Sequence, residues 1–226
     1  MLKGYFSKKE LTLLFGSLFL ITASFLIFDR QNYLTLIASL IGAASLILGA
    51  KGNFVSQILM IIFSLIYGYI SFDFGYYGEM LTYVGMTLPM SIFSLVSWLL
   101  NPHSKREVKV NKIKKAEMVA ALFLSAVVTV IFYFILKHFN TENLFFSTLS
   151  VTTSFLAVYL TFRRSAFFAL AYALNDVVLI VLWVFAAIEN ISYLSVIICF
   201  VVFLVNDLYG FINWIKMYNR QNQRAL

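Results

Sequence analysis

The chain has 226 residues, of which 62% are hydrophobic and 12% are charged, and its mean hydropathy is +0.89. Soluble domains are about 45–50% apolar and about 25% charged, so this composition excludes a soluble globular protein and indicates an integral membrane protein. The formal net charge of +7 would suit nucleic acid or anionic lipid, and the placement of the basic residues distinguishes the two.

Eight apolar segments are long enough to cross a bilayer as helices, which need about 17–25 residues at a rise of 1.5 Å each. None alternates with period two over about ten residues, so a β-barrel is excluded and the fold class is all-α. In chain order the segments are 11–28, 34–50, 54–71, 81–100, 117–136, 144–161, 166–188 and 191–214.

The basic residues divide unevenly between the two membrane faces. If the N-terminus is cytoplasmic, 15 of the 17, from Lys3 to Arg224, fall on the cytoplasmic side, and only Arg30 and Lys137 fall outside. This distribution predicts both termini in the cytoplasm of a cell-membrane protein. The basic segment 105–115, KREVKVNKIKK, is interpreted as a membrane anchor rather than a nucleic-acid site.

The fourth segment contains Pro89 in mid-span. Proline lacks a backbone donor and clashes with the preceding turn, so we expect a kink, which would either serve as a hinge or fit the packing. The segment FGYYGEM before it, with Tyr76, Tyr77 and Glu79, is interpreted as an interfacial loop on the outer side.

The two halves of the chain repeat one another weakly. An offset of 116 residues aligns Trp98 with Trp214, and offsets of 112 to 115 align Lys51 with Arg163. With four helices per half, both halves start on the same membrane face, so the repeat is parallel. Parallel repeats are typical of transporters with a substrate site near the midplane. The two tryptophans fall at helix ends, where an interfacial belt is the simpler interpretation.

Two Asn-Asp pairs interrupt the last two apolar segments: Asn175 with Asp176, and Asn206 with Asp207. A carboxylate in a bilayer core costs about 2.5–3.5 kcal/mol on insertion scales, so such residues are usually functional. The alternative is a structural role in hydrogen bonds between helices. Counting residues from the basic ends places the two aspartates about 18 and 14 Å deep, and we expect both pairs to face one cavity.

Several segments resemble the PnuC family of vitamin transporters. They are GNFVSQILMIIFSLIYGYISFDFGYYGEM from Gly52, the Pro-containing helix that ends in Trp98, FRR followed by LNDVVLIVLW, and VNDLYGFINW. The last of these carries the pattern Asn-x-x-Tyr-Gly-x-x-x-Trp. The resemblance runs from about Leu34 to Met217.

The resemblance implies facilitated import of nicotinamide riboside without a cofactor or an ion gradient, trapped by intracellular phosphorylation. Related members carry thiamine or riboflavin. It also implies a SWEET-like fold in a trimer. In that fold the first helix (1–33) precedes one three-helix bundle (34–100). A basic loop and linking helix (101–143), a second bundle (144–217) and a cytoplasmic tail (218–226) follow. Some nicotinamide riboside carriers have Trp where this chain has Ala171. The resemblance therefore does not specify which aromatic ring the substrate contains.

A riboside offers hydroxyls, an amide and a flat aromatic cation, for which amide side chains, carboxylates and aromatic rings are suited. We expect the asparagines to bind the polar groups, the aspartates to match the charge or to orient the asparagines, and the aromatic residues to stack. Two residues of the third segment are weaker candidates. The whole predicted set is Asn175, Asp176, Trp183, Asn206, Asp207, Tyr209, Tyr172, Gln57 and Tyr67.

Other functions remain open at this point. Asp176 or Asp207 could carry protons in a coupled transporter. An enzyme is disfavoured, because the chain has no HExxH or GxSxG motif and no His within any apolar segment, although an aspartyl mechanism stays formally possible. A channel or a structural membrane protein is less attractive, given the repeat and the paired polar residues.

Overall fold

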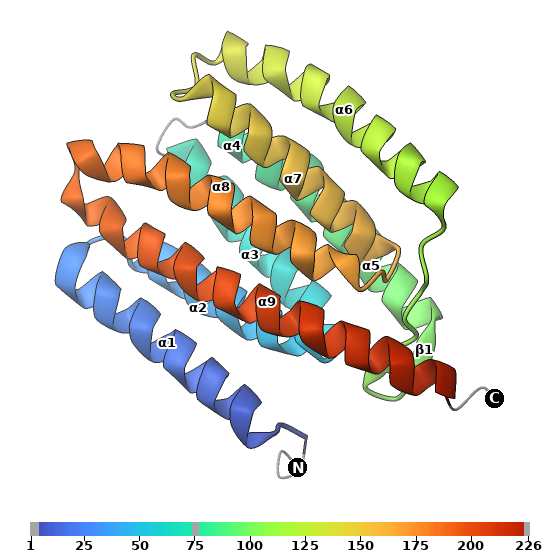
Figure 1. Ribbon diagram of the computed structural model, residues 1–226. Helices are drawn as coiled ribbons and strands as arrows, with labels where there is room; N and C mark the ends of the chain where they lie inside the picture. Colours follow the sequence, from blue (N-terminus) through green and yellow to red (C-terminus); the bar gives the residue numbers. More distant parts are fainter. Residues whose placement is uncertain (1–4, 74–76, 224–226) are drawn as a thin grey trace.

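The computed structural model describes residues 5–73 and 77–223, so Lys3, Tyr76 and Arg224 lie outside the described residues. Within these ranges eight helical segments are long and apolar enough to cross a membrane, which confirms the predicted number of spans. Figure 1 shows them as one bundle of roughly aligned helices. The helices are α1 (Lys8–Phe28), α2 (Tyr33–Ala50), α3 (Val55–Asp73), α4 (Tyr77–Leu81), a π-helical turn (Thr82–Thr87), α5 (Leu88–Leu100), α6 (Lys115–His138), α7 (Leu144–Phe162), α8 (Phe167–Glu189), a 3-10 turn (Ile191–Tyr193) and α9 (Leu194–Gln223).

Six helices form a closed ring in the order α2, α3, α5, α7, α8 and α9, with α9 packed against α2. The two others lie outside the ring, α1 against α2 and α9, and α6 against α7 (Figure 1). The first half of the chain supplies α2, α3 and α5, and the second supplies α7, α8 and α9. The ring therefore joins two three-helix units, and the described chain starts and ends at the same membrane face, called here the terminal face (Figure 1).

The repeat predicted from sequence appears as matching contacts between the two units. The indole NH of Trp98 donates to the Thr161 carbonyl of α7 over 2.9 Å, and that of Trp214 donates to the Gly49 carbonyl of α2 over 2.8 Å. The donors are 116 residues apart (214 − 98) and the acceptors 112 (161 − 49). Both indoles are buried, so they are packing residues of the core and not the interfacial belt that the sequence suggested.

The outer helices are attached to the ring in matching ways as well. Lys51, at the end of α2, pairs with Glu10 of α1 at 2.9 Å, and Arg163, at the end of α7, pairs with Glu117 of α6. Glu10 is buried, although it lies in the first turn of α1, which begins at Lys8. A charge so placed stays ionised only with a partner, so the pair fixes α1 on the ring.

A π-helical turn lies directly before Pro89. The amide of Leu88 donates to the Tyr83 carbonyl, five residues back, and the Thr87 hydroxyl donates to the Thr82 carbonyl over 3.2 Å. Proline cannot donate to the carbonyl four residues before it, so the helix widens by one residue in the preceding turn. The sequence predicted a kink at Pro89; the structure has a π-helical turn before it, and Thr82, Tyr83 and Thr87 of this turn line the cavity.

The basic loop after α5 connects the two units at the terminal face. It contains a short two-stranded ladder, β1 (Pro102–Ser104) and β2 (Glu107–Val108). Beyond it, the amide of Val108 donates to the Gly52 carbonyl and that of Asn111 to the Arg164 carbonyl, each over 2.9 Å. Gly52 has a φ of +65°, a conformation that glycine adopts without strain. The loop is thus bonded to equivalent turns in both units.

Candidate functional site

A cavity occupies the interior of the ring and is lined by residues of α2, α3, α7, α8 and α9 and of the segment from α4 through the π-helical turn. Its polar lining is a set of serines and threonines together with amide and carboxylate side chains, and its apolar lining includes several aromatic rings. The polar members are Ser45, Ser56, Gln57, Glu79, Thr82, Thr87, Thr141, Ser147, Ser150, Ser154, Thr161, Asn175, Asp176 and Asp207, and the aromatic ones are Phe63, Tyr83, Phe168, Tyr172, Phe200 and Phe203. A mostly apolar hollow with convergent polar groups is the usual form of a small-molecule site.

Three aromatic side chains fill the ring on the side of the terminal face. The ring centroids of Trp98 and Trp214 are 5.5 Å apart, and Phe168 packs edge-on against Trp214 at 4.8 Å. Trp98 and Trp214 come from equivalent positions of the two units. Both are buried, and of the three only Phe168 lines the cavity.

Asp176 and Asp207 lie inside the cavity on the neighbouring helices α8 and α9. Each is 4% exposed, and both side chains line the cavity. Atom Oδ2 of Asp176 accepts no hydrogen bond from any described residue. The described lining contains no Lys, Arg or His, so the two carboxyls face a cavity that offers them no cation.

Asn175 is held by α7 in an orientation that leaves half of its amide available. Its Oδ1 accepts hydrogen bonds from the hydroxyls of Thr153 and Ser154 over 2.8 and 3.0 Å. Its amide nitrogen makes no bond among the described residues, and the side chain lines the cavity. Across the ring, Gln57 of α3 donates to the Ser56 hydroxyl over 3.2 Å. The two amides therefore face one space from opposite units.

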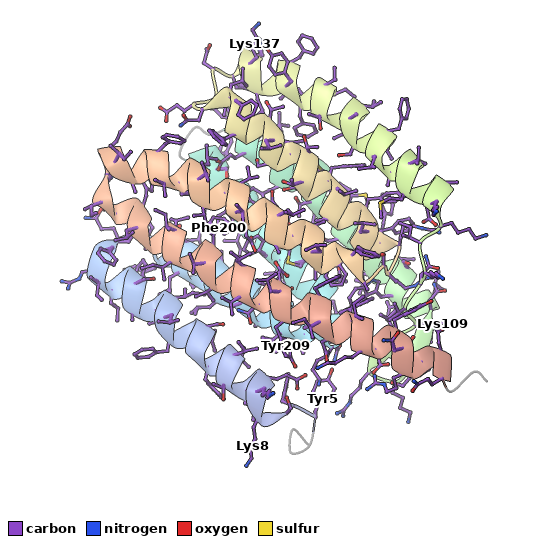
Figure 2. The ribbon with its side chains drawn as sticks, viewed as in Figure 1. Tyr5, Lys8, Lys109, Lys137, Phe200 and Tyr209 are labelled. Atoms are coloured by element: carbon purple, nitrogen blue, oxygen red, sulfur yellow. The ribbon has the colours of Figure 1, made fainter. Side chains whose placement is uncertain are left out.

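Asn206 and Tyr209 were expected in the cavity, but neither is part of its lining. The amide nitrogen of Asn206 donates to the Ser17 hydroxyl of α1 and to the Val202 carbonyl, both over 2.8 Å. The Tyr209 hydroxyl donates to Glu10 over 3.1 Å, toward the start of α1 (Figure 2). These two side chains connect α9 to α1. Adjacent residues of a helix point about 100° apart, so Asp207 faces the cavity while Asn206 does not.

Of the three other aromatic candidates, only one lines the cavity. Tyr172 lines the cavity and packs edge-on against Phe168 at 6.2 Å. Trp183 packs against Tyr193, with centroids 5.2 Å apart, and is outside the lining. Tyr67 is also outside, but its ring packs at a tilt against that of Tyr83, a lining residue, with centroids 5.1 Å apart. Of the nine predicted residues, the structure brings Gln57, Tyr172, Asn175, Asp176 and Asp207 together around one space.

Comparison with known proteins supports a transport function for this cavity. The family described as nicotinamide mononucleotide transporter matches residues 32–216. This chain belongs to that family. A nicotinamide riboside transporter, PnuC, from Neisseria mucosa is 25% identical over 209 residues, which cover 89% of this chain and 79% of that protein. The crystal structure of the vitamin B3 transporter PnuC has the same fold, with a TM-score of 0.83 at 23% identity over 96% of this chain and 95% of that one.

Membership in the nicotinamide mononucleotide transporter family makes the chain a multi-pass membrane transporter of vitamins and not an enzyme. The family match begins at residue 32, after α1. Yet α1 contacts the site region through the bonds of Ser17 and Glu10 to α9. The first helix thus holds the face of α9 opposite the cavity, while Asp207 faces the cavity.

Some lining residues of this transporter were not singled out from sequence. Ser147, Ser150, Ser154 and Thr161 of α7 recur at intervals of three, four and seven residues, which places them on one helix face. This spacing could have identified them. Glu79, expected in an interfacial loop, instead lies within α4 and lines the cavity.

Proposed function

We propose that the protein imports nicotinamide riboside by facilitated diffusion, with alternating access through its central cavity. Phosphorylation of the riboside in the cytoplasm would prevent its return. The family membership and the similarity to a nicotinamide riboside transporter support this substrate. The amides of Gln57 and Asn175 suit the sugar hydroxyls and the carboxamide, and Tyr172 offers a ring for stacking.

The single observation that carries the proposal is the charge of the cavity. Its described lining has three carboxylic acids, Glu79, Asp176 and Asp207, and no basic residue. Phosphate recognition in proteins relies on Arg, Lys or backbone amides at a helix N-terminus. A mononucleotide would bring its phosphate beside these acids without a positive partner. The cavity therefore favours the riboside over the nucleotide.

The first experiment is calorimetry on the purified protein in detergent. Nicotinamide riboside, its mononucleotide, thiamine, riboflavin and ordinary nucleosides would be titrated separately. We expect the riboside to bind and the mononucleotide to bind at least about tenfold more weakly, a difference of about 1.4 kcal/mol. If thiamine, riboflavin or another nucleoside bound more tightly, that ligand would be assigned as the substrate in place of nicotinamide riboside. If no ligand in the series bound, the proposal would be refuted.

Proton-coupled uptake is the second candidate, because Asp176 and Asp207 are buried in the transport pathway. Uptake of labelled riboside into liposomes would be compared with and without an imposed pH gradient. Facilitated diffusion predicts equilibration of the label in both cases. Accumulation above equilibrium only with the gradient would instead support coupling.

We further propose that both termini are cytoplasmic in the cell membrane and that the transporter is a trimer. Lys8 and Lys109 lie toward the terminal face, and Lys137 lies at the opposite end (Figure 2), as the positive-inside rule requires of a cytoplasmic terminal face. Single cysteines placed at His103 and His138 in a Cys199→Ser background would report the orientation through an impermeant thiol reagent. Native mass spectrometry would give the number of copies.

A further inference from the structure

The two units of the ring meet at two junctions, α5 with α7 and α9 with α2. At the α5–α7 junction, two adjacent side chains of α5 bind the last carbonyls of α7. The Ser97 hydroxyl donates to the Phe162 carbonyl over 2.8 Å, and the Trp98 indole donates to the Thr161 carbonyl. The guanidinium of Arg164 also donates to the Ser97 hydroxyl, over 2.7 Å. A charged group therefore reinforces this junction.

The α2–α9 junction repeats this arrangement without the guanidinium. The Asn213 amide donates to the Ala50 carbonyl over 2.7 Å, and the Trp214 indole donates to the Gly49 carbonyl. Both donors follow their counterparts in α5 by 116 residues (213 − 97, 214 − 98), and both acceptors precede theirs in α7 by 112 (162 − 50, 161 − 49). The position that corresponds to the arginine is Gly52 (164 − 112), which has no side chain.

The carboxylate of Glu10 supplies a charged group at the α2–α9 junction instead. Its Oε1 accepts a hydrogen bond from the Lys51 ammonium, at the end of α2, over 2.9 Å, and one from the Tyr209 hydroxyl of α9 over 3.1 Å. Figure 2 shows Tyr209 toward the start of α1. Glu10 is buried, and hydrogen bonds to an ionised group are about twice as strong as neutral ones. Through this residue α1 ties the two units together.

Both junctions lie at the terminal face, directly beside the cavity. Gly49, Ala50 and Thr161, which supply three of the accepting carbonyls, are lining residues. Within the described residues, direct hydrogen bonds between the two units occur only at these junctions. Opening a path between the units at the terminal face therefore breaks the bonds of a junction.

We propose that the α2–α9 junction is the gate of the cavity at the terminal face, and that Glu10 of α1 is its latch. This inference rests on the proposed alternating access and names the residues that control one of its two openings. The latch lies outside the residues 32–216 that match the family. Because one carboxylate holds a residue of each unit, removing its charge weakens the attachment to both, and the junction separates more often.

The test detects separation of the junction through a thiol in the cavity wall. Ala169 of α8 lines the cavity, and a Cβ at Gly210 of α9 would lie 3.6 Å from both Ala169 and Ala50. Ala169→Cys in a Cys199→Ser background places a single thiol beside the gate. A membrane-impermeant maleimide is added to vesicles whose outer surface is the terminal face, identified by the exposed control His103→Cys. Labelling needs no substrate, so it tests the gate even if another solute replaces the riboside.

Three variants are compared in this labelling assay. Glu10→Gln removes the charge but keeps an oxygen that accepts bonds from Ser7 and Tyr209, and it should raise the labelling rate at least about fivefold. Glu117→Gln is the matched control, because it removes the equivalent pair with Arg163 between α6 and α7 and bonds to neither junction. Its rate should change by less than about twofold. Tyr209→Phe removes only the bond to α9 and should raise the rate by a smaller factor.

Three results would overturn the inference. The thiol of Ala169→Cys in the otherwise unmodified chain could label as fast as His103→Cys, which would show that the terminal side is open. The rate could rise equally in Glu10→Gln and Glu117→Gln, which would indicate a general loosening of the outer helices. The rate could also stay unchanged in Glu10→Gln. Tyr209→Phe decides the last point where Glu10→Gln does not fold. Failure of every ligand to bind in calorimetry would instead refute the proposed substrate.

Discussion

Replacing each of the two buried asparagines by alanine separates binding from helix packing. The Asn175 amide nitrogen has no described partner and faces the cavity, while the Asn206 amide is bonded to α1 and to its own helix. We expect Asn175→Ala to weaken riboside binding and Asn206→Ala to weaken the attachment of α1.

The expected sizes follow from these bonds. A substrate group left without its partner in a buried site loses about 1–3 kcal/mol, which is roughly 5–150-fold in Kd. Asn206→Ala removes two hydrogen bonds of 2.8 Å, to Ser17 and Val202. Its effect on stability should be about 0.6–2 kcal/mol, and its Kd should change by less than about twofold, because the side chain is not part of the lining.

The assay is calorimetry with nicotinamide riboside together with denaturant unfolding in the same detergent. Both variants should be less stable than the parent, because Asn175 also accepts bonds from Thr153 and Ser154. Only Asn175→Ala should show the large change in Kd. If Asn206→Ala lost affinity while Asn175→Ala kept it, the assignment of these side chains to cavity and packing would be refuted.

Two further predictions concern packing. Trp214→Phe keeps an aromatic ring but leaves the Gly49 carbonyl without its donor, so the free energy of unfolding should fall by about 1–3 kcal/mol; an unchanged denaturation midpoint would contradict this. A methyl group at Gly42 would lie 2.7 Å from the Phe203 ring, a lining residue, so Gly42→Ala should weaken riboside binding measurably. Gly16→Ala, whose methyl meets nothing within 4 Å, should leave Kd unchanged and stabilise α1 by about 0.5–1 kcal/mol; a loss of affinity there would count against the steric reasoning.

The repeat illustrates how a weak sequence signal can have a precise structural meaning. Aligning Trp98 with Trp214 predicted two related halves, and the structure gives both indoles equivalent hydrogen bonds. The sequence did not show the structural role of the two tryptophans. Their places near helix ends suggested a membrane belt, but the two helix ends meet inside the ring, where the indoles pack against each other.

The apolar segments by themselves determined the number of membrane-spanning segments, because a bilayer leaves no water for unpaired backbone groups and so requires a helix for each crossing. Their ends were less well predicted, since the last segment was expected to end at Trp214 and α9 continues to Gln223. The Asn-Asp pairs likewise marked two of the helices that line the cavity, α8 and α9. Which member of each pair reaches the cavity was decided only by tertiary structure. Neighbouring side chains on a helix diverge by about 100°, and the bonds of α9 to Ser17 and Glu10 on α1, together with that of Trp214 to Gly49 on α2, fix its rotation. The contacts with α1 join residues 189 and 199 positions apart, a separation at which the local sequence pattern carries no information about direction.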